Sequence, residues 1–330
     1  MNKLEVDKYL SDPSVRIGME IEFVIPKFEK DHESEIIKLY NYQDMIWEYD
    51  IYTDALAEWY ETDNKKPPKV PKWAKKMGYK NGEEIPDPEE FMSDSLKKYF
   101  RSLVKYFRAD KLPFQYTVSA DYFYHDKDKW CLKPDSTIGL AGIEISSPIL
   151  TLPEYLELCP KIFRHIDMYG GKTTDDCGFH VSLSLNNNLW YKRLNTIKMA
   201  AMVDENYIYK RFPNRKYNEY AQSVHSDIES IINNNDKLID RIKEKTFKRK
   251  PKFTESHHMA INIEHLTKKN KYVEFRYIGG KNYHRRWADI KKLTAHYIRS
   301  IRWGCSDYGD DFFIKKMETL RRRARRNANV

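Results

Sequence analysis

Two glutamates, Glu20 and Glu22, interrupt the apolar segment IGMEIEF at residues 17–23. Strict alternation of apolar and polar residues is typical of a β-strand, and it turns both carboxylates to the same face. Like charges on one strand face repel each other, and burying them without a partner destabilises the fold. The segment therefore indicates a place where a cation neutralises two carboxylates.

The same alternation recurs in four later segments, GIEIS (142–146), CGFHVSLSL (177–185), HMAINIE (258–264) and YVEFRY (272–277). One face of each is apolar, and the other carries Glu144, His180, Asn262, Glu264, Glu274 and Arg276. A solvated face of an antiparallel sheet is the alternative interpretation. However, this face is expected to be nearly free of lysine and rich in carboxylates with one imidazole, which suit Mg²⁺ or Mn²⁺. Asp135, in the turn KPDST, would add a further carboxylate.

The elements that position these residues are strands and helices in separate clusters. Further strands are predicted within 114–125 and 130–150, and segments 257–265 and 271–278 are predicted to form a hairpin. Helices are predicted at about 33–61, 90–108, 153–169, 190–208, 218–234 and 285–303. Hairpins imply antiparallel pairing, so the predicted fold class is α+β.

Composition narrows the class of protein. The chain has 330 residues, of which 41% are hydrophobic, enough for a sizeable core. No apolar run approaches the roughly 18 residues of a membrane helix, and the first residues lack the apolar region of a signal peptide. The four cysteines are scattered. We therefore expect a reduced, cytoplasmic protein without a membrane partner.

The net charge of +9 is unevenly distributed. Five arginines lie in RRRARR at 321–326, and a second basic stretch, RIKEKTFKRKPK, spans 241–252. Such runs bind nucleic acid or other anions in some proteins, but a solvated helix end or loop is the commoner explanation. Nucleic acid therefore stays open as a partner through these two stretches.

Six segments in order resemble the amidoligase family, the carboxylate–amine ligases related to glutamine synthetase and gamma-glutamylcysteine ligase. They are RIGMEIEF, KPDSTIGLAGIEISSPIL, CGFHVSLSL, FPNRKYNEYA, HMAINIE and YVEFRYIGGKN, within residues 16 to about 303. The resemblance implies a single glutamine synthetase-like domain over 1–330, with a curved antiparallel sheet and helices on its outer face. Residues 30–113 match nothing in the family and are expected to be a helical insertion. A basic helix is expected at about 310–330.

The resemblance also implies ATP-dependent joining of a carboxylate to an amine through an acyl phosphate, with two or more Mg²⁺ or Mn²⁺ ions. Glu22, Asp135 and Glu144 would hold one ion, and Glu20, His180 and Glu274 another that bridges the ATP phosphates. Arg276 would stabilise the transferring phosphoryl group, and Arg215 would bind phosphate or the substrate carboxylate. Asn262 would orient a neighbour in the ATP site, to which Glu274 and Arg276 also belong.

Three departures from the family pattern concern the acceptor pocket: Ser182 replaces a second histidine, Ser136 a glycine, and His257-His258 an Arg-Tyr pair. The alternative function is therefore a catalytically silent protein on the same fold, either a phage-type structural protein or a nucleic-acid-binding protein. The sequence does not name the carboxylate or the amine, which range from an amino acid to a peptide or a protein side chain.

Overall fold

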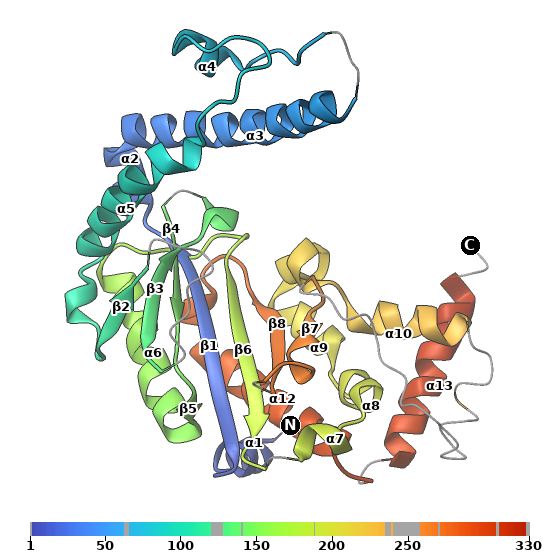
Figure 1. The fold of residues 1–330 in the computed structure, drawn as a ribbon. Coiled ribbons are helices and arrows are strands. Elements are labelled where there is room, and N and C mark those ends of the chain that lie inside the picture. Colours follow the sequence, from blue (N-terminus) through green and yellow to red (C-terminus); the bar gives the residue numbers. More distant parts are fainter. Residues whose placement is uncertain are drawn as a thin grey trace.

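The structure, a computed structural model, describes residues 2–62, 66–119, 128–139, 141–187, 189–234, 239, 258–269, 271–307 and 310–327. An eight-stranded sheet lies at the centre of this part (Figure 1). Its strands are β1 (Val15–Val24), β2 (Tyr116–Val118), β3 (Trp130–Pro134), β4 (Gly142–Ser146), β5 (Leu150–Thr151), β6 (Gly178–Leu185), β7 (Ile261–Asn262) and β8 (Val273–Gly279). The strand order is β2-β3-β4-β1-β6-β8-β7, and β5 pairs with β1.

The sheet is mixed, because β2 runs parallel to β3 while the other described pairs are antiparallel. The expectation of a wholly antiparallel sheet is therefore wrong at this edge. Alternation of residue types reveals which face a side chain takes but not the direction of its strand. Within the predicted segment 114–125 the structure has a strand at Tyr116–Val118, and residues 120–125 lie outside the described part.

Strand register sets the polar face of the sheet. Glu20 on β1 pairs with His180 on β6, and Glu22 pairs with Glu144 on β4. On the other side of β6, Glu274 of β8 pairs with Ser182, and Asn262 of β7 pairs with Glu274. Directly paired residues point to the same face, so the predicted set lies on one face of the sheet.

Two long helices cover the opposite, apolar face: α6 (Leu152–Met168) and α12 (Trp287–Gly304) (Figure 1). Phe163 of α6 contacts Phe179 of β6, with ring centroids 5.6 Å apart. Tyr297 of α12 stacks on Phe275 of β8 at 4.3 Å. All four rings are buried, so this packing fixes the strands whose polar faces carry the glutamates.

Further helices lie beside the sheet: α1 (Lys3–Leu10), α7 (Trp190–Arg193), α8 (Thr196–Ala201), α9 (Glu205–Arg211), α10 (Val224–Asn233) and α13 (Asp310–Asn327). The single helix predicted at 190–208 is thus three helices. Asn195 and Asp204 explain the breaks, because their side chains accept hydrogen bonds from the backbone amides that open α8 and α9. The basic helix predicted at about 310–330 is present as α13.

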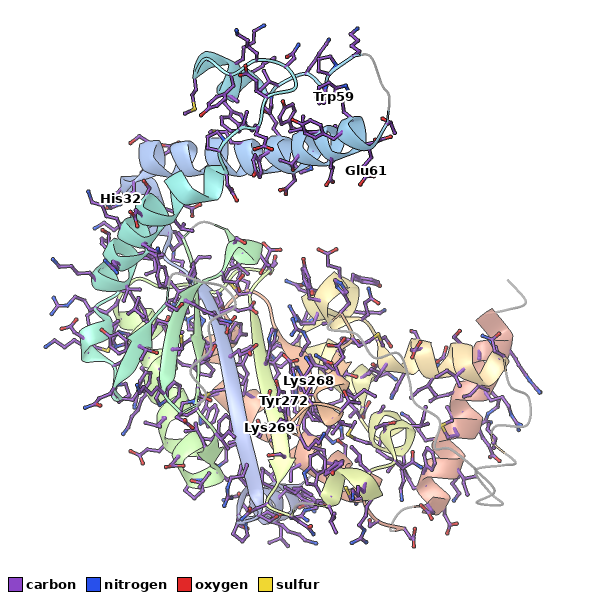
Figure 2. All side chains as sticks on the ribbon, in the orientation of Figure 1. His32, Trp59, Glu61, Lys268, Lys269 and Tyr272 are labelled. Carbon is purple, nitrogen blue, oxygen red and sulfur yellow. The ribbon has the colours of Figure 1, made fainter. Side chains whose placement is uncertain are left out.

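Helices α2 (Pro26–Asp31), α3 (Glu33–Glu61), α4 (Lys72–Lys76) and α5 (Pro88–Tyr106) form an arm beside the sheet. The helices predicted at 33–61 and 90–108 are present as α3 and α5. Around α4 the arm has its own small core, centred on Tyr52, Leu56 and Ala74. Figure 2 shows Trp59 and Glu61 at the far end of α3. That residues 30–113 are an insertion in the family stays a prediction.

Short 3₁₀ helices connect the main elements: η1 (Ala109–Lys111), η2 (Ser136–Ile138), η3 (Pro213–Tyr217), η4 (Glu219–Ala221), η5 (Glu264–Leu266) and η6 (Tyr283–Arg285). The predicted hairpin is present as the antiparallel pair β7 and β8, but β7 ends at Asn262. Glu264, predicted on the polar sheet face, therefore lies in η5. The basic stretch 241–252 and His257 lie outside the described residues.

None of the described helices is both long and apolar enough to cross a membrane.

All four cysteines are described, and none of them is in a disulfide. Cys131, Cys159 and Cys177 are buried, and Cys305 is half-buried.

Candidate active site

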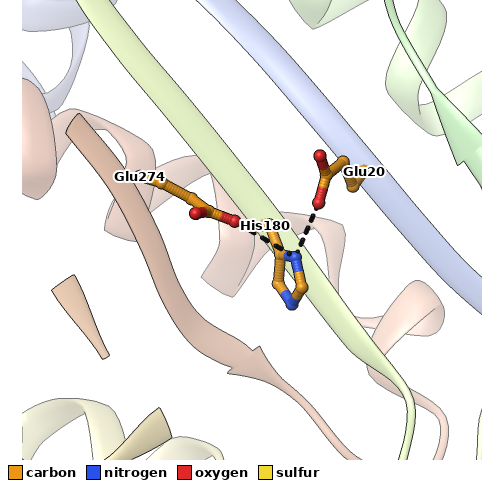
Figure 3. Close-up of side chains that lie close together, drawn as sticks. All are labelled: Glu20, His180 and Glu274. Atoms are coloured by element: carbon orange, nitrogen blue, oxygen red, sulfur yellow. Dashed lines mark hydrogen bonds and ion pairs between the residues drawn. The ribbon is translucent and has the colours of Figure 1, made fainter. Parts of the chain in front are cut away.

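His180 lies where three carboxylates meet (Figure 3). Its Nδ1 is 2.9 Å from Oε2 of Glu20 and 3.4 Å from Oε1 of Glu274, while its Nε2 is 3.4 Å from Oε1 of Glu22. The side chains of His180, Glu22 and Glu274 are at most 9% exposed, whereas that of Glu20 is 37% exposed. The cluster is therefore a pocket wall that opens to solvent beside Glu20.

The local backbone explains why one imidazole reaches carboxylates on both neighbouring strands. The pairing of β6 with β8 shifts register between Phe179 and Val181, so His180 sits at an irregularity in the ladder. Such irregularities re-aim side chains and are frequent at functional sites. A Cβ at Gly178 would come within 2.7 Å of Nε2 of His180. Glycine at this position therefore leaves the room that the imidazole occupies.

Glu274 is held from both sides. Nδ2 of Asn262 donates to Oε2 of Glu274 at 3.0 Å, and Arg276 donates to Oε1 at 2.8 Å. Arg276 also donates through Nε to the carbonyl oxygen of Tyr220 at 3.1 Å. Arg276 and Asn262 thus both contact the carboxylate of Glu274, and the roles predicted for them stay predictions.

Arg215 is more deeply buried than its position between the predicted helices 190–208 and 218–234 indicated. It is 1% exposed, yet it lines the same cavity as Arg276. Its side chain donates to the carbonyl oxygen of Arg276 at 2.9 Å, and its Nε has no hydrogen-bond partner in the described structure. Burial lowers the pKa of Arg215, which the charge of Glu22 opposes. A buried donor without a partner is uncommon in native structures.

The other three predicted ligands line the cavity but are engaged by neighbouring groups. Oδ1 of Asp135 accepts hydrogen bonds from the amide and hydroxyl of Thr137, at 3.0 and 2.6 Å. Oε2 of Glu22 accepts from the amide of Gly178 at 2.5 Å. Oε1 of Glu144 accepts from the hydroxyl of Ser146 and lies 3.1 Å from Nζ of Lys133.

Lys133, which contacts the predicted ligand Glu144, is one of the residues that sequence reasoning missed. Because Lys133 of β3 pairs with Glu144 of β4, both side chains lie on the polar face. The expectation of a face nearly free of lysine is therefore wrong at the β3 edge. The alternation in WCLKP would have placed this lysine if the strand at 130–134 had been aligned with the one at 142–146.

The pKa shifts reflect excess buried negative charge. Burial raises the pKa of Glu22, and the charge of Asp135 adds to this effect. Burial likewise raises the pKa of Glu144, together with the charge of Glu20. For Glu20 burial acts in the same direction, but the hydrogen bond and charge of His180 outweigh it and lower the pKa to about 2. A bound cation would offset the unfavourable burial of these negative charges.

The cavity at this site has a volume of about 450 Å³. Beyond the residues already described, Asp176, Asn218 and Glu219 form part of its wall. A second cavity of about 230 Å³ begins at Glu20 and continues along the sheet face. Its wall includes Arg16, Gly18, Ser147, Pro148, Ile149, Ser182, Ser184, Lys271 and Tyr272. Glu20 thus separates an acidic cavity from one with basic and aromatic walls.

Glu20, His180 and Glu274 fit a divalent metal ion. One ligand atom from each lies within 4.8 Å of the others, and no second such group of three exists among the residues that the structure describes. Two carboxylates and one imidazole are ligands that Mg²⁺ and Mn²⁺ accept. Glu22, Asp135 and Glu144 do not form a comparable group, so the structure brings together one of the two predicted ligand sets.

Comparison with known proteins identifies the family of the chain. Residues 13–296 match the family described as "putative amidoligase enzyme", so the chain belongs to the amidoligase family. A cryo-EM structure of Plasmodium falciparum glutamine synthetase is similar at 13% identity and a TM-score of 0.32, over 92% of this chain and 55% of that one. The chain thus spans about half the length of that enzyme. No curated protein matches the chain.

Proposed function

We propose that the protein is an ATP-dependent carboxylate–amine ligase. The observation that carries the proposal is the Glu20, His180 and Glu274 cluster, which lies beside two arginines in one cavity. Phosphoryl transfer needs positioning and electrostatic stabilisation more than covalent help from the protein, and metal ions with arginines supply both.

The three residues of the cluster would hold Mg²⁺ or Mn²⁺, with Glu20 and Glu274 as carboxylate ligands and His180 as the nitrogen ligand. Such an ion neutralises phosphate charge and polarises a phosphoryl oxygen. Asn262 holds Glu274 in place through Oε2. The second predicted set, Glu22, Asp135 and Glu144, stays a prediction.

The two arginines have different tasks in this proposal. Arg276 points from β8 into the cavity and is 14% exposed, so its planar donors are available to the oxygens of the transferring phosphoryl group. Arg215 lies beneath it and supports the backbone of Arg276. Arg215, which also lines the cavity, would bind the substrate carboxylate or a phosphate.

The proposed reaction has two steps. A carboxylate oxygen of the first substrate attacks the γ-phosphorus of ATP, which releases ADP and leaves an acyl phosphate. The amine nitrogen then attacks the acyl carbon, phosphate leaves with the C–O bond electrons, and the nitrogen loses a proton. Asp176 and Glu219 give the cavity an acidic wall that attracts the ammonium form of the amine.

The cavity beyond Glu20 suits the rest of the nucleotide. Lys271 and Arg16 provide positive charge there, and Ser182 and Ser184 leave space on the sheet face. The ring of Tyr272 stacks on that of His265 at 4.1 Å, which forms an aromatic wall for a base.

The test combines binding with turnover. Calorimetry with a non-hydrolysable ATP analogue, with and without Mg²⁺, should show metal-dependent binding. Amino acids and peptides are then screened in pairs for amine-dependent phosphate release. Transfer of ¹⁸O from a labelled carboxylate to phosphate would establish the acyl phosphate.

Equal nucleotide affinity with and without metal, together with no turnover of any pair, would favour the silent protein on the same fold.

A peptide or protein substrate is part of the proposal, because the arm formed by α3 to α5 adds surface that a small substrate does not need.

A further inference from the structure

Lys133 forms an ion pair with Glu144, which lines the acidic cavity. Nζ of Lys133 lies 3.1 Å from Oε1 of Glu144, and the two side chains are 15% and 11% exposed. The hydroxyl of Ser146 donates to the same oxygen. A cation therefore already neutralises Glu144, one of the carboxylates expected to bind a second metal ion.

The remaining members of that ligand set are also engaged. Oδ1 of Asp135 accepts two hydrogen bonds from Thr137, and Oε2 of Glu22 accepts one from Gly178. Mg²⁺ requires several oxygens at about 2.0–2.1 Å in octahedral geometry. Here the ligand atoms of the three carboxylates do not converge, in contrast to those of Glu20, His180 and Glu274.

We propose that the ammonium group of Lys133 takes the place of a second metal ion, so that this protein binds one divalent ion, at Glu20, His180 and Glu274. The proposal rests on the metal site of the proposed function and replaces the expectation of two or more ions. A covalently attached cation cannot be removed by a chelator. It also holds Glu144 in one position on β4, where the carboxylate faces the substrate cavity.

The experiment is a Mn²⁺ titration of the full-length protein without nucleotide, in which calorimetry and the electron paramagnetic resonance signal of free Mn²⁺ give the stoichiometry. Wild type should bind one ion. Glu144→Gln should leave that stoichiometry at one and change the affinity less than threefold. Glu274→Gln should weaken the same ion at least tenfold.

Lys133→Met removes the ammonium group and keeps the length of the side chain. It should raise the stoichiometry from one to two, or strengthen a second ion at least tenfold, because Glu144 loses its cation. The double variant Lys133→Met with Glu144→Gln should return to one ion. Lys172→Met, at an exposed position, is the matched control and should behave as wild type.

A wild-type stoichiometry of two, with one ion lost in Glu144→Gln, would overturn the proposal while leaving the ligase proposal intact. Binding of no ion would overturn both. If Lys133→Met does not fold, the comparison of wild type with Glu144→Gln decides alone.

Discussion

The imidazole of His180 lies 2.9 Å from the carboxylate of Glu20, although 160 residues separate them in the chain. The two residues are direct partners in the pairing of β1 with β6. The relationship therefore does not depend on a loop, because the hydrogen bonds of two central strands fix it. A site built in this way is preorganised, and small changes in the strands should alter its chemistry more than its stability.

The first prediction concerns the room around His180. In Gly178→Ala, the new Cβ would lie 2.7 Å from Nε2 of His180 and 3.2 Å from Oε2 of Glu22, so the imidazole must move. We expect Mn²⁺ affinity to fall by about tenfold or more, as for other disturbances of ligand orientation. Calorimetry measures the loss, and circular dichroism should show an unchanged fold.

Gly18→Ala is the matched control on the same face of the sheet. The new Cβ would meet Cβ of Ser182 at 3.4 Å, an ordinary contact. Its Mn²⁺ affinity should remain within about twofold of wild type. Equal affinities in the two variants would show that His180 does not contribute to metal binding as we infer.

The second prediction concerns Arg276. Lysine at this position keeps the charge but cannot supply planar donors to Glu274, the Tyr220 carbonyl and a phosphoryl oxygen together. Arg276→Lys should keep the fold and Mn²⁺ binding and lose about 10³ in ligase turnover. Steady-state kinetics on the substrate pair found by screening provide the measurement.

Arg285→Lys is the corresponding control, since Arg285 lies at the surface and pairs with Asp167 outside the cavity. It should retain full turnover. Near-normal turnover in Arg276→Lys would mean that another residue stabilises the phosphoryl group. Arg215 would be the next candidate.

Much of the site followed from alternation of residue types, for a physical reason. A strand's period of two assigns every residue to a face, so Glu20, Glu144, His180 and Glu274 could be grouped without knowing the strand order. Alternation contains no information on register. The choice between one and two groups of ligands, and the approach of Lys133 to Glu144, depend on which residues pair across strands.

The helix boundaries were predicted less completely where side chains cap the backbone amides at the start of a helix. Apolar spacing predicted one helix over 190–208, but Asn195 and Asp204 divide it because their side chains satisfy helix amides locally. The parallel pairing of β2 with β3 was missed, since no pattern in a three-residue strand encodes direction. Arg215 was expected to bind phosphate or the substrate carboxylate, but its burial was missed because it arises from packing against β8.

The third prediction concerns nucleic acid and the arginines of α13. Phe313, Met317, Leu320 and Ala324 are buried on one side of this helix, and Arg323 pairs with Glu229 of α10 at 3.3 Å. Truncation would therefore disturb packing as well as charge. Replacing the exposed Arg322, Arg325 and Arg326 with Gln tests charge alone.

If α13 binds nucleic acid, the triple variant should lose affinity, and the slope of log affinity against log salt should fall by about 0.9 per lost phosphate contact. Fluorescence anisotropy with labelled DNA and RNA at several salt concentrations measures both. A variant with Lys97, Lys98 and Arg101 changed to Gln removes three exposed charges from α5 and serves as control. Absence of binding by wild type at low salt would exclude this partner.

The last prediction is a pH dependence of stability that arises far from the site. Arg302 of α12 donates to Oδ2 of Asp12 through Nε at 2.9 Å, which ties the segment after α1 to α12. Burial raises the pKa of Asp12, but hydrogen bonds from Ser14 and Arg302 outweigh burial, and the pKa is lower than normal. The ion pair therefore stabilises the fold above the unfolded-state pKa of about 3.9, and this contribution is lost as pH falls through the lower folded-state value.

Asp12→Asn should accordingly lower the free energy of unfolding by about 1 kcal/mol at pH 7. The difference from wild type should shrink as the pH falls below about 3.9, because protonation then removes the same charge from the wild-type protein. Urea unfolding at pH 7 and at several lower values gives both numbers, with Asp7→Asn on the exposed side of α1 as control. A destabilisation that stays constant over this pH range would mean that Asp12 acts through the shape of its turn and not through its charge.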